Sequence, residues 1–112
     1  MKESPIFSKT YDLVAWLIPL TLRFPRSQRF VMAEILQKEV IRFQTLLIEA
    51  AHQVQPLALL TEADSELDKL RTHVRLSKDL SLMSFAQYEY AAQQLTEVGK
   101  LLGGWKRTAA RG

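Results

Sequence analysis

Residues that interrupt helices are rare in this chain and occur at widely spaced positions. The first glycine is Gly99, and the four prolines are Pro5, Pro19, Pro25 and Pro56. Because proline removes a backbone donor and glycine weakens a helix, the long stretches between these residues favour helices. Apolar residues recur in those stretches at spacings of three and four, and no alternating strand pattern competes with them. The sequence therefore predicts an all-α fold.

The connections between the predicted helices are short, which places consecutive helices antiparallel in an up-down-up-down four-helix bundle. Pro25 ends the first helix, and Pro56 suits the first turn of the third. Ser84 and Gln87 have the spacing of a capping box, and the pair Gly103–Gly104 ends the fourth helix. We expect a single domain over residues 1–112. Its four helices should span about 8–24, 26–54, 56–82 and 84–103, followed by a basic tail at 104–112.

One apolar stripe on each helix predicts the core. The expected core residues are Leu13, Leu17, Leu20 and Phe24; Ala33, Leu36, Val40, Phe43, Leu47, Ala50 and Val54; Leu60, Ala63, Leu67, Leu70, Val74 and Ser77; and Phe85, Tyr88, Ala92, Leu95, Gly99 and Leu102. Phe30 is also assigned to the core. The second helix has a second apolar side, formed by Ile35, Ile41, Leu46 and Ile48. This side indicates contact with a neighbouring helix or with another subunit.

Composition excludes several classes of site. The chain has no cysteine, so it has no disulfide, no thiolate metal site and no cysteine nucleophile. Its longest apolar run, Leu13–Leu22, is too short to span a bilayer, and the N-terminal sequence lacks the apolar region of a signal peptide. We therefore expect a soluble, cytoplasmic protein that does not associate with a membrane.

The sequence gives little support to enzyme chemistry. The two histidines, His52 and His73, lie in different predicted helices, and there is no glycine-rich phosphate loop. Glu49 and His52 form one Glu-x-x-His pair, whereas a di-iron bundle needs two such pairs. The residues thus predict no catalytic site, no metal site and no cofactor. A metal-dependent bundle enzyme is an alternative that rests on Glu49 and His52 alone.

Basic residues are clustered, although the net charge is only +3. Arg71, Arg75 and Lys78 recur at i, i+4 and i+7, which predicts a basic ridge on the third helix, opposite its core stripe. Acidic residues precede these bases along the helix, an order that the helix dipole alone can explain. Two further clusters are Arg23, Arg26 and Arg29 near the first corner, and Lys100, Lys106, Arg107 and Arg111 near the C-terminus. In an up-down bundle, Arg23, Arg26 and Lys78 share one end.

Four stretches of the sequence resemble one known family. They are YDLVAWLIPLTLRFPRSQRF (Tyr11–Phe30), LLIEAA (Leu46–Ala51), LDKLRTHVRLSKDLSLMSFAQYEYAAQQL (Leu67–Leu95) and VGKLLGGWKR (Val98–Arg107). The most specific parts are FPRSQRF and GKLLGGW. Through these stretches the chain resembles the Avd proteins, the accessory variability determinants of diversity-generating retroelements. They belong to a wider four-helix-bundle family that includes proteins encoded in ribosomal-RNA intervening sequences.

The resemblance implies a barrel-like homopentamer with a basic outer surface. It also implies a non-enzymatic accessory protein that binds the retroelement's reverse transcriptase and RNA, or DNA, during mutagenic copying of template RNA into cDNA. Carried over to this chain, the binding residues are first Arg71, Arg75 and Lys78, and second Arg23, Arg26 and Arg29. The alternative is an oligomeric interaction or scaffold bundle without nucleic-acid binding, which the modest net charge and the apolar second helix favour.

Overall fold

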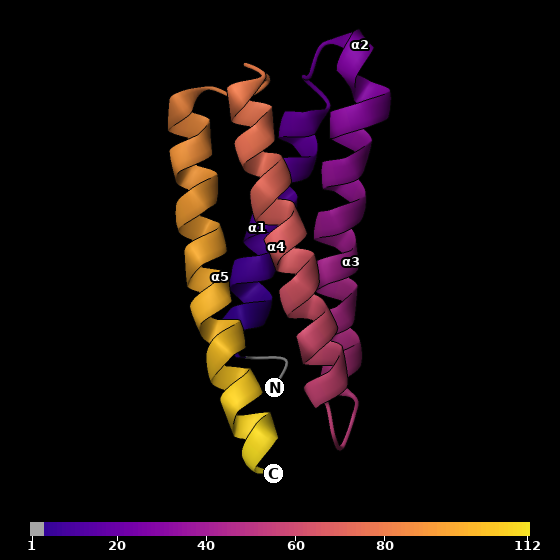
Figure 1. Cartoon of the computed structure of the whole chain (residues 1–112), viewed down its shortest axis with the longest axis vertical. Coiled ribbons are helices and arrows are strands. Elements are labelled where there is room, and N and C mark those ends of the chain that lie inside the picture. Colours follow the sequence, from indigo (N-terminus) through magenta and orange to yellow (C-terminus); the bar gives the residue numbers. More distant parts are fainter. Residues whose placement is uncertain (1–3) are drawn as a thin grey trace.

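The computed structural model describes residues 4–112, which form helices joined by short connections (Figure 1). Four long helices pack side by side, and the described residues contain no strand. The predicted all-α fold is confirmed. The elements are α1 (Pro5–Thr21), α2 (Arg26–Gln28), the π-helical segment η1 (Arg29–Ala33), α3 (Glu34–Ala51), α4 (Leu57–Asp79) and α5 (Phe85–Arg111).

The helices form a closed, antiparallel arrangement. Both α1 and α4 pack against α3 and α5, so α1 and α4 lie diagonally across the bundle. One end, which we call the corner pole, consists of residues 22–30 and 80–85 (Figure 1). The other end, the terminal pole, holds the beginning of α1, the connection between α3 and α4, and the end of α5. The bundle measures 46 × 23 × 21 Å along its principal axes.

The first helix lies earlier in the chain than predicted, at Pro5–Thr21 instead of 8–24. Pro5 starts this helix because the first turn has no use for the N–H that proline lacks. Pro19 lies inside α1, as predicted. The helix ends before Phe24, whose backbone N–H donates to the carbonyl of Thr21 over 3.1 Å in a tighter turn.

A π-helical turn changes the register at the start of the second long helix. In an uninterrupted α-helix, Phe30 would precede the buried Ala33 by three residues and face the core. The segment Arg29–Ala33 is instead π-helical, and the wider turn rotates the residues before it relative to α3. Phe30 is consequently 81% exposed, whereas Phe24 is buried. The assignment of Phe30 to the core was therefore wrong, and that of Phe24 is confirmed.

Two boundaries differ around the connection between α3 and α4. The helix α3 ends at Ala51, so Val54 lies in the connection and is 98% exposed. The prediction that Val54 belongs to the core was wrong. Pro56 is the N-cap residue of α4, one position before the first turn in which the sequence placed it.

The last helix is longer than predicted. It continues through Gly103–Gly104 to Arg111, so the predicted end at 103 and the separate basic tail were wrong. Tertiary contacts stabilise the helix beyond its glycines. The Trp105 ring packs edge-on against Phe7 with 5.8 Å between the ring centroids, and Lys106 Nζ donates to the Asp64 carboxylate over 2.9 Å. The capping box predicted at the start of α5 is confirmed, with both of its hydrogen bonds formed.

The buried residues of α1, α3 and α4 are those that the sequence predicts, whereas in α5 a different stripe of residues is buried. Every core residue predicted between Leu13 and Phe24, between Ala33 and Ala50 and between Leu60 and Ser77 is buried. In α5 the prediction holds for Leu95 and Leu102 but fails for Phe85, which is 65% exposed. Tyr88, Ala92 and Gly99 are half-buried at the edge of the stripe. The residues of α5 that fill the core are Ala91, Leu95, Val98 and Leu102.

The second apolar side of α3 is divided between the interior and the surface. Leu46 is buried, and Ile35 is half-buried against the core. Ile41 and Ile48 are exposed. Within the described residues, no helix combines the length and the hydropathy that a membrane span requires.

Candidate nucleic-acid interface

Arg71, the first residue of the predicted ridge, lies between two helices. Gly99 of α5 has no side chain, and the Arg71 guanidinium occupies the space where a Cβ at position 99 would stand. Arg71 Nη1 also donates to the Asp68 carboxylate over 3.0 Å. A close contact between α4 and α5 is therefore present at Gly99, and the guanidinium of Arg71 makes it. The prediction that Arg71 points away from the core was wrong, because its guanidinium lies against Gly99 of α5.

The other two residues of the ridge differ in their surroundings. Lys78 Nζ lies 4.6 Å from the centroid of the Tyr88 ring and 3.3 Å from Asp79 Oδ1. Lys78 is thus held by a cation–π contact with α5 and by a neighbouring carboxylate. Arg75 is exposed and forms no ion pair with any acid in the described part of the chain. Only Arg75 therefore presents its full charge to solvent.

The corner pole holds the second predicted cluster. Arg23 and Arg26 flank Pro25, are exposed, and have no ion-pair partner among residues 4–112. The side chain of Arg29, the third member, lies outside the described part of the structure. Arg75 stands four residues before the end of α4, about 6 Å along the helix axis from the same pole. The expected sharing of one end by Arg23, Arg26 and Lys78 follows from this topology (Figure 1).

The third cluster lies towards the terminal pole and is offset by acids. Lys106 is paired with Asp64, whereas Lys100, Arg107 and Arg111 are exposed. The first half of α4, which approaches the same pole, carries Glu62, Asp64 and Glu66. These acids are themselves paired with Arg42, Lys106 and Lys69. Fewer acids lie near the corner pole, where Asp79 is paired with Lys78, Glu34 lies 2.7 Å from Lys38, and Glu89 is exposed. The positive field is therefore stronger at the corner pole.

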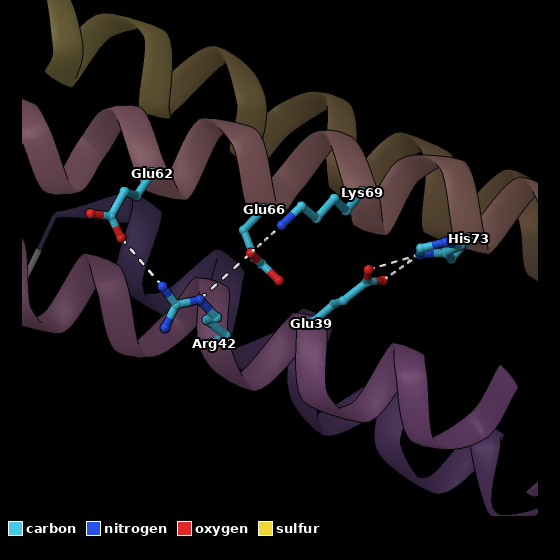
Figure 2. A network of polar contacts seen from close by, with 6 residues as sticks. All are labelled: Glu39, Arg42, Glu62, Glu66, Lys69 and His73. Carbon is cyan, nitrogen blue, oxygen red and sulfur yellow. Dashed lines mark hydrogen bonds and ion pairs between the residues drawn. The ribbon is translucent and has the colours of Figure 1, made fainter. Parts of the chain in front are cut away.

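A network of ionic groups between α3 and α4 was not predicted (Figure 2). His73 Nδ1 of α4 lies 2.8 Å from both carboxylate oxygens of Glu39 of α3. In the same network Glu66 lies 3.6 Å from Arg42 Nε and 3.5 Å from Lys69 Nζ. One sequence signal could have revealed Glu39, because it follows Leu36 by three residues and precedes Phe43 by four, the spacing of a core-facing position.

Burial determines the titration of the Glu39 carboxyl. Desolvation raises the pKa of Glu39 above its ordinary value of 4.5, and the nearby charge of Glu66 adds to this rise. The hydrogen bond and charge of His73, together with the charge of Lys69, oppose it. The acids on the face between α3 and α4 are thus paired with Arg42, Lys69 and His73 of the same face, which makes this face unsuited to a polyanion.

Replacing Glu39 by glutamine should remove one component of the pH dependence of stability. A raised pKa in the folded state means that Glu39 contributes stability fully below pH 4.5, and this contribution is lost as the pH rises through the raised pKa. We therefore expect the free energy of unfolding of the wild type, relative to Glu39→Gln, to fall as the pH rises from about 4.5 through the raised pKa of Glu39. Urea unfolding of both proteins across this range measures the difference. A difference that does not change with pH would contradict the burial of this carboxyl.

The residues of the metal alternative, Glu49 and His52, are exposed at the end of α3. In the part of the chain that the structure describes, no three acidic or histidine side chains are grouped as a metal site requires. The enzyme alternative therefore rests on this exposed pair of residues.

A protein-family model described as bAvd-like matches residues 5–109 of the chain. The match extends from the first residue of α1 almost to the end of α5, and it includes both poles of the bundle. No curated protein matches the sequence.

Proposed function

The chain belongs to the bAvd-like family, and from this membership we propose that it is the accessory protein of a diversity-generating retroelement. In this role it acts in the cytoplasm, where it binds the element's reverse transcriptase and template RNA and supports mutagenic cDNA synthesis. The family is an accessory family without a catalytic function of its own. The chemistry of copying therefore belongs to the polymerase, and this chain supplies binding surfaces.

The observation that supports RNA binding best is the uneven distribution of charge along the bundle. Arg23, Arg26 and Arg75 are exposed near the corner pole and have no ion-pair partner in the described part of the chain. Cationic side chains of this kind bind phosphate groups and contribute affinity without sequence preference. We assign the principal RNA contacts to these three arginines, with Arg29 as a further member from the sequence. Arg71 and Lys78 contribute less, because Asp68 and Tyr88 already engage them.

We further propose that the protein assembles as a barrel-like homopentamer. The exposed apolar residues Ile41 and Ile48 of α3 support an assembly, because contact with another copy would cover them. Assembly would repeat the arginines of the corner pole around one axis, so that weak individual contacts with RNA add up. Sedimentation velocity would measure the mass of the assembly directly, and a single-chain mass at micromolar concentration would contradict it.

Binding of template RNA should weaken steeply as salt is added. Three phosphate contacts per chain predict a slope of about −2 in a plot of log affinity against log salt concentration. Affinity should then fall roughly 20-fold between about 50 and about 200 mM salt, and more steeply if several copies bind together. Fluorescence anisotropy with labelled RNA measures this slope, and RNA binding that does not depend on salt would contradict phosphate contacts.

A second candidate function is an oligomeric interaction scaffold that holds the polymerase without touching RNA. The exposed apolar side chains of the bundle favour it, because they fit a protein partner as well as a second copy. The two candidates differ in one measurement. A scaffold would bind reverse transcriptase with little salt dependence and would show no measurable affinity for template RNA.

A further inference from the structure

Two phenylalanines near the corner pole have their rings largely in solvent. Phe30 is 81% exposed and Phe85 is 65% exposed. Leu22 and Leu80, on the connections at the same end of the bundle, are exposed as well. Phe30 and Phe85 stand at the starts of helices that lie diagonally across the bundle, so they bound this end on two sides. Exposed apolar side chains at one end of a folded domain indicate a surface that binds another molecule.

Both phenylalanines are held on regular elements. Phe30 lies in the π-helical segment, a rare backbone form that occurs frequently at functional sites. Phe85 is the first residue of α5 and follows Ser84, whose side chain accepts a hydrogen bond from the backbone N–H of Gln87 over 3.1 Å. The backbone therefore presents each ring from a defined position, which lowers the entropic cost of binding.

Cationic groups accompany both phenylalanines. In the sequence, Arg23 and Arg26 lie between Leu22 and Phe30, and Arg75 and Lys78 precede Leu80 and Phe85. An open hollow of about 690 Å³ is lined by residues 78–79 and 81–85, among them Lys78 and Phe85. The acid Glu89, one turn further along α5, is exposed and opposes this positive field in part. The exposed arginines supply the unpaired positive charge of this end, whereas Lys78 beside Phe85 is paired with Asp79 of the same hollow.

We propose that the corner pole binds unpaired nucleotides of a single-stranded nucleic acid. Bases stack on the rings of Phe30 and Phe85, while the phosphates between them pair with Arg23, Arg26 and Arg75. Aromatic rings together with a basic surface are the features with which proteins bind single strands. This inference rests on the proposed function and extends it, because phosphate contacts alone would not distinguish single strands from duplexes.

The alternatives fit this surface less well. A duplex keeps its bases stacked inside and offers no free base face to Phe30 or Phe85. An apolar protein partner would bury Arg23, Arg26 and Arg75 without a counter-charge, which is costly. The bundle is 23 × 21 Å in cross-section, so a strand of a few nucleotides is long enough to contact both rings. Single-stranded nucleic acid therefore matches the rings, the charge and the dimensions of the pole.

The test compares an oligouridine single strand with a blunt-ended RNA duplex. In the double variant Phe30→Leu and Phe85→Leu the surface stays apolar but loses both aromatic rings. Two lost stacking contacts should weaken single-strand binding roughly 30-fold or more, because each is worth at least about 1 kcal/mol. Duplex binding, which depends on the arginines, should stay within about twofold of the wild type. Tyr11→Leu is the matched control, because it removes an equally exposed aromatic ring from α1 outside the corner pole.

The possible outcomes distinguish stacking of bases on the two rings from a protein contact and from an absence of RNA binding. Selective loss of single-strand binding in the double variant, with Tyr11→Leu unchanged, supports the inference. If the double variant binds the oligouridine as the wild type does, the inference is overturned while RNA binding stands. Loss of reverse transcriptase binding with RNA binding intact would show that the rings contact protein and would also overturn it. A wild-type protein that binds neither RNA would overturn both the inference and the proposed role in RNA binding.

Discussion

Replacing Arg23, Arg26 and Arg75 together by glutamate should weaken the binding of template RNA by more than 100-fold. Each hydrogen bond to a charged phosphate contributes about 1.5 kcal/mol or more, so the loss of three contacts alone costs about 4.5 kcal/mol. The three introduced carboxylates then repel phosphate and add to this loss. Anisotropy titrations at one fixed salt concentration measure the effect, since affinities at different salt concentrations are not comparable.

The chain offers a matched control for this experiment. Lys100, Arg107 and Arg111 are exposed towards the terminal pole, and their replacement by glutamate changes the net charge by the same amount. The control should lose much less affinity, because these three side chains lie at the opposite end of the bundle from the proposed site. Equal losses in both triple variants would show that RNA senses the net charge of the protein and would contradict a localised site. Circular dichroism should show unchanged helix content in both variants, because all six side chains are exposed.

Truncation of Phe43 to alanine should destabilise the protein by about 3 to 5 kcal/mol. Phe43 is fully buried in α3, so its loss removes apolar contacts and leaves a cavity in the core. Small domains are stable by about 5 to 15 kcal/mol in total, and the variant should therefore unfold at a much lower denaturant concentration. Urea unfolding followed by circular dichroism measures the change.

Phe30→Ala is the natural comparison, because the same side chain is removed from an exposed position. Its free energy of unfolding should change by no more than about 0.5 kcal/mol. A cost at Phe30 close to the cost at Phe43 would contradict the outward position that the π-helical turn gives this ring. The pair of variants thus tests whether Phe30, which the sequence pattern wrongly assigned to the core, is exposed.

Local periodicity was sufficient to predict most of the fold. The stripes of α1, α3 and α4 depend on spacings of three and four within one helix, and the structure buries each of these stripes. The capping box at Ser84 is likewise a local signal, and both of its hydrogen bonds are present. Phe30 was misplaced because a π-helical turn adds a residue to the helical repeat, and the sequence has no marker for that insertion.

Contacts between distant segments account for the remaining differences. The extension of α5 past Gly103–Gly104 depends on Trp105 meeting Phe7, two residues at opposite ends of the sequence. The position of Arg71 depends on a missing side chain on another helix. For the candidate site, the sequence predicted the charged residues and placed Arg23, Arg26 and Lys78 at the same end of the bundle. It did not reveal which cations are already engaged by neighbours, because that requires knowing which helix faces which.

The glycine at position 99 has a consequence for the charge that this bundle displays. A residue with no side chain makes room for one guanidinium, and Asp68 holds that guanidinium in place. Any larger residue there would force Arg71 out of this space towards water, on the flank that also carries Arg75. The number of positive groups available to a polyanion is thus governed by side-chain volume on a different helix, and a neutral substitution could enlarge the electrostatic footprint without adding a single basic residue.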